Sequence, residues 1–199
     1  MNTKMIFLDL DGTLLNDKKE LPEANKKARD FRSTESTWEG LYMTHAEKAK
    51  AYFEQGYSCA QAVTVAFAED MGIEVDQAAR MASSFGGGVG RLRELCGCVS
   101  GIALVAGILY GYEAPEAREE KAEHYALIQK LAGEFKEQAG SMICRELLAG
   151  INNDTNPVPE ARTEAYYKKR PCAELCYMAA GILEKEIEER ERAARKIEE

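Results

Sequence analysis

The sequence predicts an all-α protein, a single helical bundle that carries a short strand-and-helix appendage at its N-terminus. From about residue 44 onward, capping residues, apolar positions at helical spacing and glycine stops follow one another. Apolar residues make up 45% of the 199, which is enough for a hydrophobic core and excludes disorder over the whole chain. Residues 1–42 differ from the rest, because they open on the short apolar run MIFLDL, typical of a buried strand, and continue without clear periodicity.

The first helices of the bundle are indicated by their boundaries. Thr44 followed three residues later by Glu47 is a capping-box signature. Gly56 and Gly72 are natural helix stops. The predicted ranges for three successive helices are 44–55, 58–71 and 76–84.

A glycine-rich stretch divides the bundle. Glycine costs about 1 kcal/mol at an interior helix position, so FGGGVG at residues 85–90 is predicted to be a loop. An apolar, largely buried helix is expected at 98–111, and a long amphipathic helix at 115–138 places Leu127, Leu131 and Phe135 on one face. The remaining elements are a short helix at 144–149, a loop at 151–159, and a last helix from Pro171 that ends in a charged, solvated run.

Charge and hydropathy exclude several classes of protein. The formal net charge of −8 argues against nucleic-acid binding, which needs a basic face. The longest apolar run, Gly101 to Tyr112, is too short for a bilayer that requires about 20 residues. The opening residues place acids inside their apolar stretch and show no small-residue cleavage site, unlike a signal peptide. We therefore expect a cytoplasmic protein without membrane insertion.

Six cysteines are the most informative residues of the chain. In a reducing cytosol such a number favours metal ligation or redox chemistry, although single free cysteines often serve only as small buried hydrophobes. Most of them fall at predicted helix starts, where the helix dipole favours a thiolate. There is no C-x-x-C pair, so zinc-ribbon and ferredoxin patterns are absent. The six are Cys59, Cys96, Cys98, Cys144, Cys172 and Cys176.

Several separated stretches resemble the redox-active protein family that is named for its C_GCAxxG_C_C cysteine pattern. The matching stretches are HAEKAKAYFEQGYSCAQAV, SFGGGVG with CGCVSG, FKEQAGSMICRELL and RPC, which together span about residues 44–183. The resemblance implies a small helical protein with four characteristic cysteines, and an iron–sulfur centre is suspected for the family. Cys98 stands where the family usually has alanine, and Cys176 is additional. The four family cysteines are carried here by Cys59, Cys96, Cys144 and Cys172.

The resemblance leads us to expect electron transfer or redox sensing through a cysteine-ligated iron–sulfur centre. The expected ligands are the four family cysteines, with Cys98 and Cys176 as spare or exchanging thiols that can also contact a metal. The first alternative is a metal-free thiol–disulfide or sulfur-carrier protein in which Cys96 and Cys98 form the reactive pair, and structural zinc is another. A redox partner protein of unknown identity is expected, and a symmetric homodimer is a common default.

A second motif lies in the N-terminal appendage. Asp9-Leu10-Asp11-Gly12-Thr13-Leu14 resembles the first motif of the haloacid-dehalogenase-like phosphatases, in which the first aspartate is the nucleophile, the second is the acid/base, and both help to place Mg²⁺. A Mg²⁺-dependent phosphatase that uses Asp9 and Asp11 is therefore a further alternative. No later motif of that family can be placed. We therefore interpret residues 1–42 as a truncated phosphatase head joined to a cysteine-bearing redox domain at 43–199.

The other chemistry-bearing residues give weaker signals. His124 lies in a charged helix without a second ligand at metal spacing, which favours a surface or half-buried role. The FGGGVG loop is not a phosphate-binding P-loop, because Arg91 and Leu92 follow it instead of Lys and Ser or Thr. Arg91, Arg93 and Arg145 stand near cysteines, where they either stabilise thiolates or are simply solvated.

Overall fold

The computed structural model describes residues 43–151 and 154–198, and the regular structure in these residues is entirely helical. The predicted all-α class is confirmed for this part of the chain. No strand occurs among the described residues, where Leu95 and Ile143 form only an isolated antiparallel bridge. The elements are α3 (His45–Glu54), α4 (Cys59–Ala66), α5 (Val75–Ala82), the 3₁₀ helix η1 (Ser83–Phe85), α6 (Gly97–Tyr110), α7 (Arg118–Ala139), α8 (Cys144–Leu147), α9 (Glu164–Lys169) and α10 (Cys172–Glu198).

Helix α3 confirms its predicted start. The Thr44 hydroxyl accepts a hydrogen bond from the Glu47 backbone N–H, and the Thr44 N–H donates to Glu47 Oε2 at 2.8 Å, so the capping box is complete. The prediction that the second helix continues to Met71 is wrong, because α4 ends at Ala66. The N–H groups of the next two residues bond to carbonyls three positions back, which replaces the helical ladder by turns up to Gly72.

Two other predictions are corrected. Helix α7 begins at Arg118 and not at Pro115, because Ala117 has a non-helical backbone and its N–H closes a turn onto Ala114. Helix α9 was not predicted, since its six residues are too few to show an amphipathic period. The side chain of Thr163 caps it by accepting from the Tyr166 N–H.

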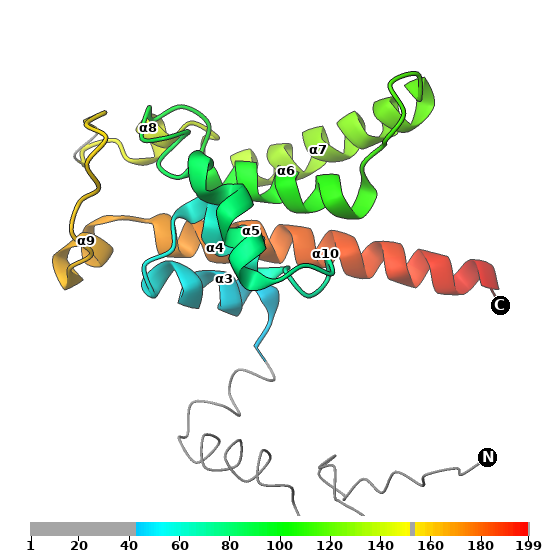
Figure 1. Ribbon diagram of the computed structural model, residues 1–199, viewed down its shortest axis with the longest axis horizontal. Coiled ribbons are helices and arrows are strands. Elements are labelled where there is room, and N and C mark those ends of the chain that lie inside the picture. The colour runs from blue at the N-terminus through cyan, green and yellow to red at the C-terminus, as the bar shows by residue number, and fades with distance from the viewer. Residues whose placement is uncertain (1–42, 152–153, 199) are drawn as a thin grey trace, which may run out of the picture. The chain divides into compact units, whose positions relative to one another are not determined.

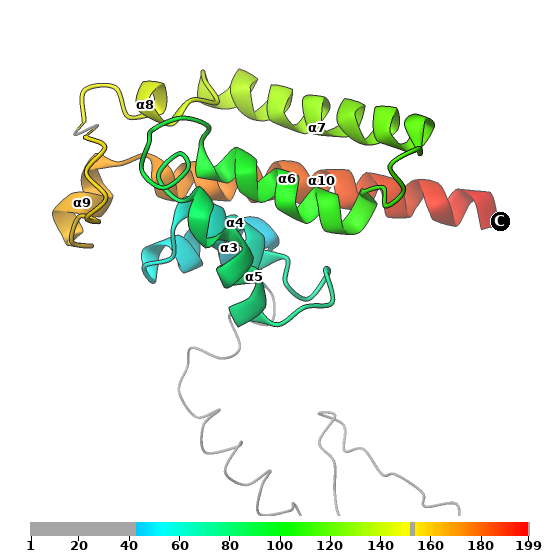
Figure 2. The ribbon, with the colours of Figure 1, turned by 45° about the horizontal axis from the view of Figure 1, so that its top comes forward.

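The longest helix, α10, organises the bundle. It packs against α3, α4, α6 and α7, and α4 in turn packs against α3 and α6 (Figures 1 and 2). Side chains from these helices meet in one hydrophobic core, whose largest fully buried members include Phe53, Phe67, Phe135, Leu131 and Leu183. The N-terminal ends of α4, α6 and α10 all reach this core, which brings residues far apart in the sequence together.

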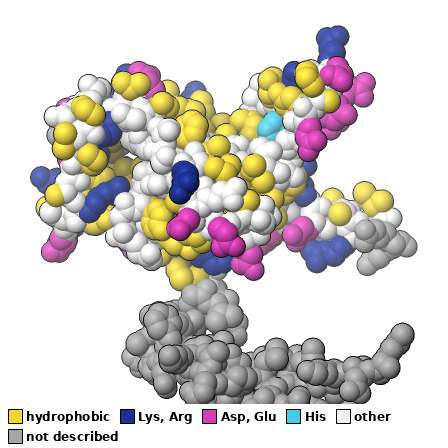
Figure 3. Space-filling view, viewed as in Figure 1, with side chains coloured by type: hydrophobic (Ala, Val, Ile, Leu, Met, Phe, Trp, Pro, Cys, Tyr) yellow, Lys and Arg dark blue, Asp and Glu magenta, His cyan; other side chains and the backbone are white. Residues whose placement is uncertain are grey.

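The surface carries many charged side chains of both signs. Figure 3 shows acidic side chains gathered at the end where α6 leads into α7, and both basic and acidic side chains at the end occupied by α8 and α9. No helix among the described residues has the length and apolarity needed to span a membrane. The strand and the DLDGTL motif that were predicted within residues 1–42 lie outside the described residues, so the phosphatase-like head stays a prediction.

Candidate metal centre

All six cysteines lie at the N-terminal ends of four helices. Three of them are the first residues of α4, α8 and α10, one is the N-cap of α6, one is the second residue of α6, and one follows a turn later in α10. At these positions unpaired backbone N–H groups and the helix dipole favour negative charge on sulfur. In that order they are Cys59, Cys144, Cys172, Cys96, Cys98 and Cys176.

Three of the thiols form a close group. The Sγ atoms of Cys59, Cys98 and Cys176 all lie within 4.8 Å of one another. The Sγ atoms of Cys98 and Cys176 are 3.7 Å apart, and the Cys176 thiol also donates to the backbone carbonyl of Cys59 at 3.8 Å. Cys98 and Cys176 are fully buried, whereas Cys59 is partly exposed. The group therefore has one thiol that solvent or a partner can reach.

The group divides into one acidic thiol and two that resist ionisation. Hydrogen bonds from the thiols of Cys172, Cys176 and Cys98 hold the pKa of Cys59 well below its usual value, against the opposing effect of burial. The pKa of Cys98 is raised because it is the donor to its neighbouring sulfurs, and that of Cys176 is raised chiefly by burial. Cys59 is thus the thiol of the group that ionises most readily.

The remaining cysteines border this group at different depths. Cys172 is a neighbour of Cys59, and the hydrogen bond between them raises the pKa of Cys172 far above its usual range. Cys96 interacts with the thiol of Cys98. Burial raises the pKa of Cys144 to about 11, against the opposing effect of the Arg93 guanidinium beside it.

Glycines, which have no Cβ atom, let the helix starts approach one another. A Cβ on Gly97 would lie 2.9 Å from the Ala60 backbone nitrogen and 3.2 Å from the Cys59 Cβ, so glycine is required where α6 meets α4. Gly88 has φ +73°, and a Cβ there would lie 2.8 Å from the Cys144 Cβ. The glycine-rich loop and the start of α6 therefore position the cysteines by close backbone contact.

Comparison with known proteins identifies a family for this chain. Residues 57–186, well over half of the chain, match the profile of the family described as "Putative redox-active protein (C_GCAxxG_C_C)". The chain belongs to this family. No curated protein and no solved structure matches it.

The close group combines the family pattern with this chain's own cysteines. It contains one of the four C_GCAxxG_C_C family cysteines, Cys59, and both of the additional ones, Cys98 and Cys176. The latter two were expected to be spare or exchanging thiols, and the structure places them at the centre. The ligand set of four family cysteines stays a prediction, as does the reactive pair Cys96–Cys98.

A cavity of about 440 Å³ lies against the cysteine group and is lined by Cys59, Cys144 and Cys172. The sequence pointed to Arg91 and Arg93 beside it. A third arginine of the cavity, Arg170, begins the RPC stretch of the family resemblance. The sequence gave no signal for the fourth, Arg162, because it lies between the loop at 151–159 and α9 in a segment without a motif.

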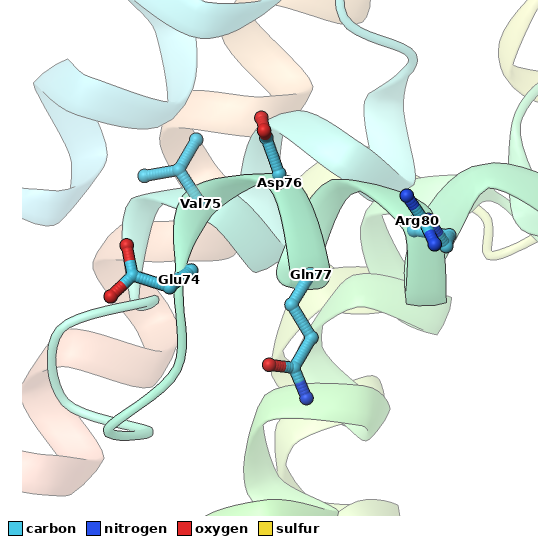
Figure 4. Close-up of a pocket in the computed structure, with 5 residues that line it drawn as sticks. All are labelled: Glu74, Val75, Asp76, Gln77 and Arg80. Carbon is cyan, nitrogen blue, oxygen red and sulfur yellow. The ribbon is translucent and has the colours of Figure 1, made fainter.

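Two further polar side chains, those of His45 and Arg145, are paired with carboxylates. The His45 imidazole is held between Glu184 and Asp70, with nitrogen–oxygen distances of 2.8 and 3.0 Å, and is stacked on Phe67, so it ties α3 to its neighbours. Arg145 pairs with Glu94 and is half exposed. A shallow hollow of about 680 Å³ is lined by five side chains of α5 and its N-cap, which point in different directions (Figure 4). None of these residues is a cysteine and all five are exposed, so the hollow has no features of a metal or ligand site.

Proposed function

We propose that this protein is an electron-transfer or redox-sensing protein in which Cys59, Cys98 and Cys176 hold a redox-active metal centre. The observation that carries the proposal is the convergence of these three sulfurs to within 4.8 Å at the meeting point of α4, α6 and α10. Membership of the redox-active family supports it independently. Thiolates are soft ligands that select zinc, copper(I) and iron–sulfur centres.

The spacing of the sulfurs fits metal ligation. A tetrahedral metal with metal–sulfur bonds of about 2.3 Å places neighbouring sulfurs about 3.8 Å apart. The Cys98 and Cys176 sulfurs, at 3.7 Å, already have this separation. The acidic thiol of Cys59 supplies the first thiolate, and the protons of the other thiols would leave when a metal binds.

A fourth ligand is available on either side of the group. Cys172 neighbours Cys59 and Cys96 neighbours Cys98, and both are buried. Iron–sulfur clusters are held by four cysteine thiolates, so this end of the bundle has a sufficient set. We favour iron over zinc because zinc has no redox chemistry and would leave the family's redox role to the thiols alone.

The test is metal analysis on full-length protein purified without oxygen. We expect iron and sulfide in comparable amounts, with a visible spectrum that bleaches on reduction. Zinc in place of iron would contradict the redox role of the metal but would still be consistent with cysteine ligation. A colourless protein without bound metal would overturn the proposal.

Single cysteine variants distinguish the two possible ligand sets. Alanine is the appropriate replacement, because buried cysteines behave as small hydrophobes. We expect Cys98→Ala and Cys176→Ala to lose the metal, while Cys144→Ala, the matched buried control outside the close group, keeps it. The reverse result would assign the centre to the four family cysteines.

The contact between Cys98 and Cys176 favours a second function, thiol–disulfide exchange without metal. Oxidation would form one S–S bond of about 2.05 Å and release two protons and two electrons to a disulfide or quinone acceptor. Mass analysis after alkylation of the oxidised protein would reveal this pair. A bridge between Cys96 and Cys98 would instead support the pair that the sequence suggested.

A further inference from the structure

The cavity beside the cysteine group is lined by four arginines. Its volume of about 440 Å³ lies in the range of about 300–1,000 Å³ that is typical of small-molecule sites. Its walls come from the start of α4, the glycine-rich loop and the segment that leads through α9 to α10. Four guanidinium groups face one carboxylate there: Arg91, Arg93, Arg162 and Arg170, with Glu160.

Two of these arginines are neutralised by carboxylates. Arg91 pairs with Asp154 at 3.0 Å, and Arg170 pairs with Glu160 at 2.6 Å. Two of the four arginines of the cavity therefore remain outside these ion pairs.

The other two arginines contact carbonyl oxygens, aromatic rings and, for Arg93, the Cys144 thiol. Arg93 Nε donates to the Asp154 backbone carbonyl at 3.1 Å, and Arg162 Nη2 donates to the Tyr57 carbonyl at 3.3 Å. Neither forms an ion pair with a carboxylate in the part of the chain that the structure describes. Two positive charges without a paired carboxylate among the described residues thus lie at the wall of a protein whose formal net charge is −8.

Arg93 carries the strongest indication of a missing ligand. Its side chain is only 4% exposed, and its Nη2 atom is buried without a hydrogen-bond partner among the described residues. A buried, unsatisfied donor on a charged group costs more than one on a neutral group, so native structures rarely retain it. The residue also has a left-handed backbone, φ +62°, which proteins tolerate mainly at functional sites.

We propose that this cavity binds an anionic small molecule through an oxyanion group of the phosphate or sulfate type, held by Arg93 and Arg162. The planar guanidinium fork matches such oxygens in geometry as well as in charge. Because Cys59 lines the same cavity and is the exposed member of the cysteine group, the bound molecule lies against the redox site. The assignment does not depend on which metal, if any, the cysteines hold.

The simplest competing explanation is that the arginines only balance thiolate charge. In that case the cavity would take no added anion, or would take chloride as readily as phosphate. Oxyanion binding in excess of chloride binding at equal ionic strength distinguishes the two explanations.

The experiment is calorimetric titration of full-length, purified protein with sodium phosphate and with sodium sulfate, against sodium chloride at matched ionic strength. We expect saturable binding of one oxyanion per chain. Arg162→Gln and Arg93→Gln should each weaken binding about tenfold or more, since a charged hydrogen bond is worth about 1.5–3 kcal/mol. Arg195→Gln removes the same charge at an exposed site distant in sequence on α10 and should change the affinity by less than about twofold.

The outcomes that overturn the proposal are explicit. Heats no larger than those of chloride, or equal affinities in the three variants, would reject the site. If Arg93→Gln fails to fold, exposed Arg162 decides the question. Metal content measured on the same samples separates the two proposals, because phosphate binding by a metal-free protein would contradict only the metal centre.

Discussion

The cysteine end of the bundle, where α4, α6, α8 and α10 begin, and the layer formed by α3 and α10 are built in different ways. Along α3 and α10, Ala46, Ala49 and Phe53 face a helix that contributes Ala180 and Leu183 to the core, so ordinary side-chain packing holds the layer together. The cysteine end instead relies on missing Cβ atoms, left-handed residues in the loop after η1, and buried thiols. The α3–α10 layer supplies stability. The cysteine end positions the thiols, and glycines and left-handed residues there reduce its contribution to stability.

The largest expected effect comes from the packed layer. Leu183→Ala removes a fully buried side chain from α10 and should lower the free energy of unfolding by about 2–5 kcal/mol, measured by urea denaturation. Metal content per folded chain should be unchanged, because the substitution does not touch the sulfurs. Loss of the metal from a protein that is still folded would show that the two regions are not separable.

The cysteine end should make stability depend on alkaline pH. Burial raises the pKa of Cys144 to about 11, whereas a thiol in the unfolded chain ionises near about 8.5. The unfolded state therefore loses its proton first, and the stabilising contribution is complete below about pH 8.5 and is lost as the pH rises to about 11. The total is about 3 kcal/mol.

Urea denaturation of the metal-free, reduced protein between pH 7 and 11 measures this dependence. In Cys144→Ala, the fall in unfolding free energy across this range should be smaller by about 3 kcal/mol. Cys98 and Cys176, whose pKa values are also raised, are present in both proteins. Parallel curves for the two proteins would show that Cys144 ionises normally in the folded state.

Local features of the sequence predicted which helices form better than they predicted where those helices begin and end. The capping box at Thr44 and the apolar face of α7 depend on residues within a turn or two of each other, and both are present. The end of α4 and the start of α7 were placed wrongly, because the turns that set them compete closely with helix in energy. Helix α9 has six residues, too few to show a period.

The candidate site was predictable only in part, for a related reason. Capping residues and glycines place the cysteines at helix starts, and these signals are local. The contact of Cys98 with Cys176 depends on how α6 packs against α10, which no local pattern encodes. The cavity arginines, such as Arg162, are brought to the cysteines by a segment without regular hydrophobic spacing.

Two glycines of α6 test whether close approach shapes the cysteine end. Gly97→Ala introduces a Cβ 2.9 Å from the Ala60 nitrogen, so the helices must shift, at an expected cost of about 1–3 kcal/mol together with reduced metal binding. Gly107→Ala is the matched control, since a Cβ there meets nothing within 4 Å. It should stabilise the protein by about 0.5–1 kcal/mol. Equal unfolding free energies for the two variants would remove the proposed role of Gly97.

The smallest and most selective effect is expected from the two capping boxes. Thr44 caps α3 and Ser58 caps α4, in each case with a reciprocal bond from the third helical residue. Replacing either by alanine should cost about 1 kcal/mol of unfolding free energy, because one backbone donor loses its partner. Ser58, however, fixes the helix start whose first residue is Cys59, and it packs under the glycine-rich loop, where a Cβ on Gly86 would lie 2.7 Å from its own Cβ.

The reactivity of Cys59 then separates the two variants. In metal-free, reduced protein, Cys59 should be alkylated by iodoacetamide at a lower pH than the other five thiols, because its pKa is held well below the usual value. Ser58→Ala should move this onset toward higher pH, since a frayed helix start presents fewer oriented N–H groups and a less regular set of thiol donors. Thr44→Ala should leave the onset where it is. If both variants shift it equally, general loosening of the bundle, and not the geometry at the start of α4, controls the thiol.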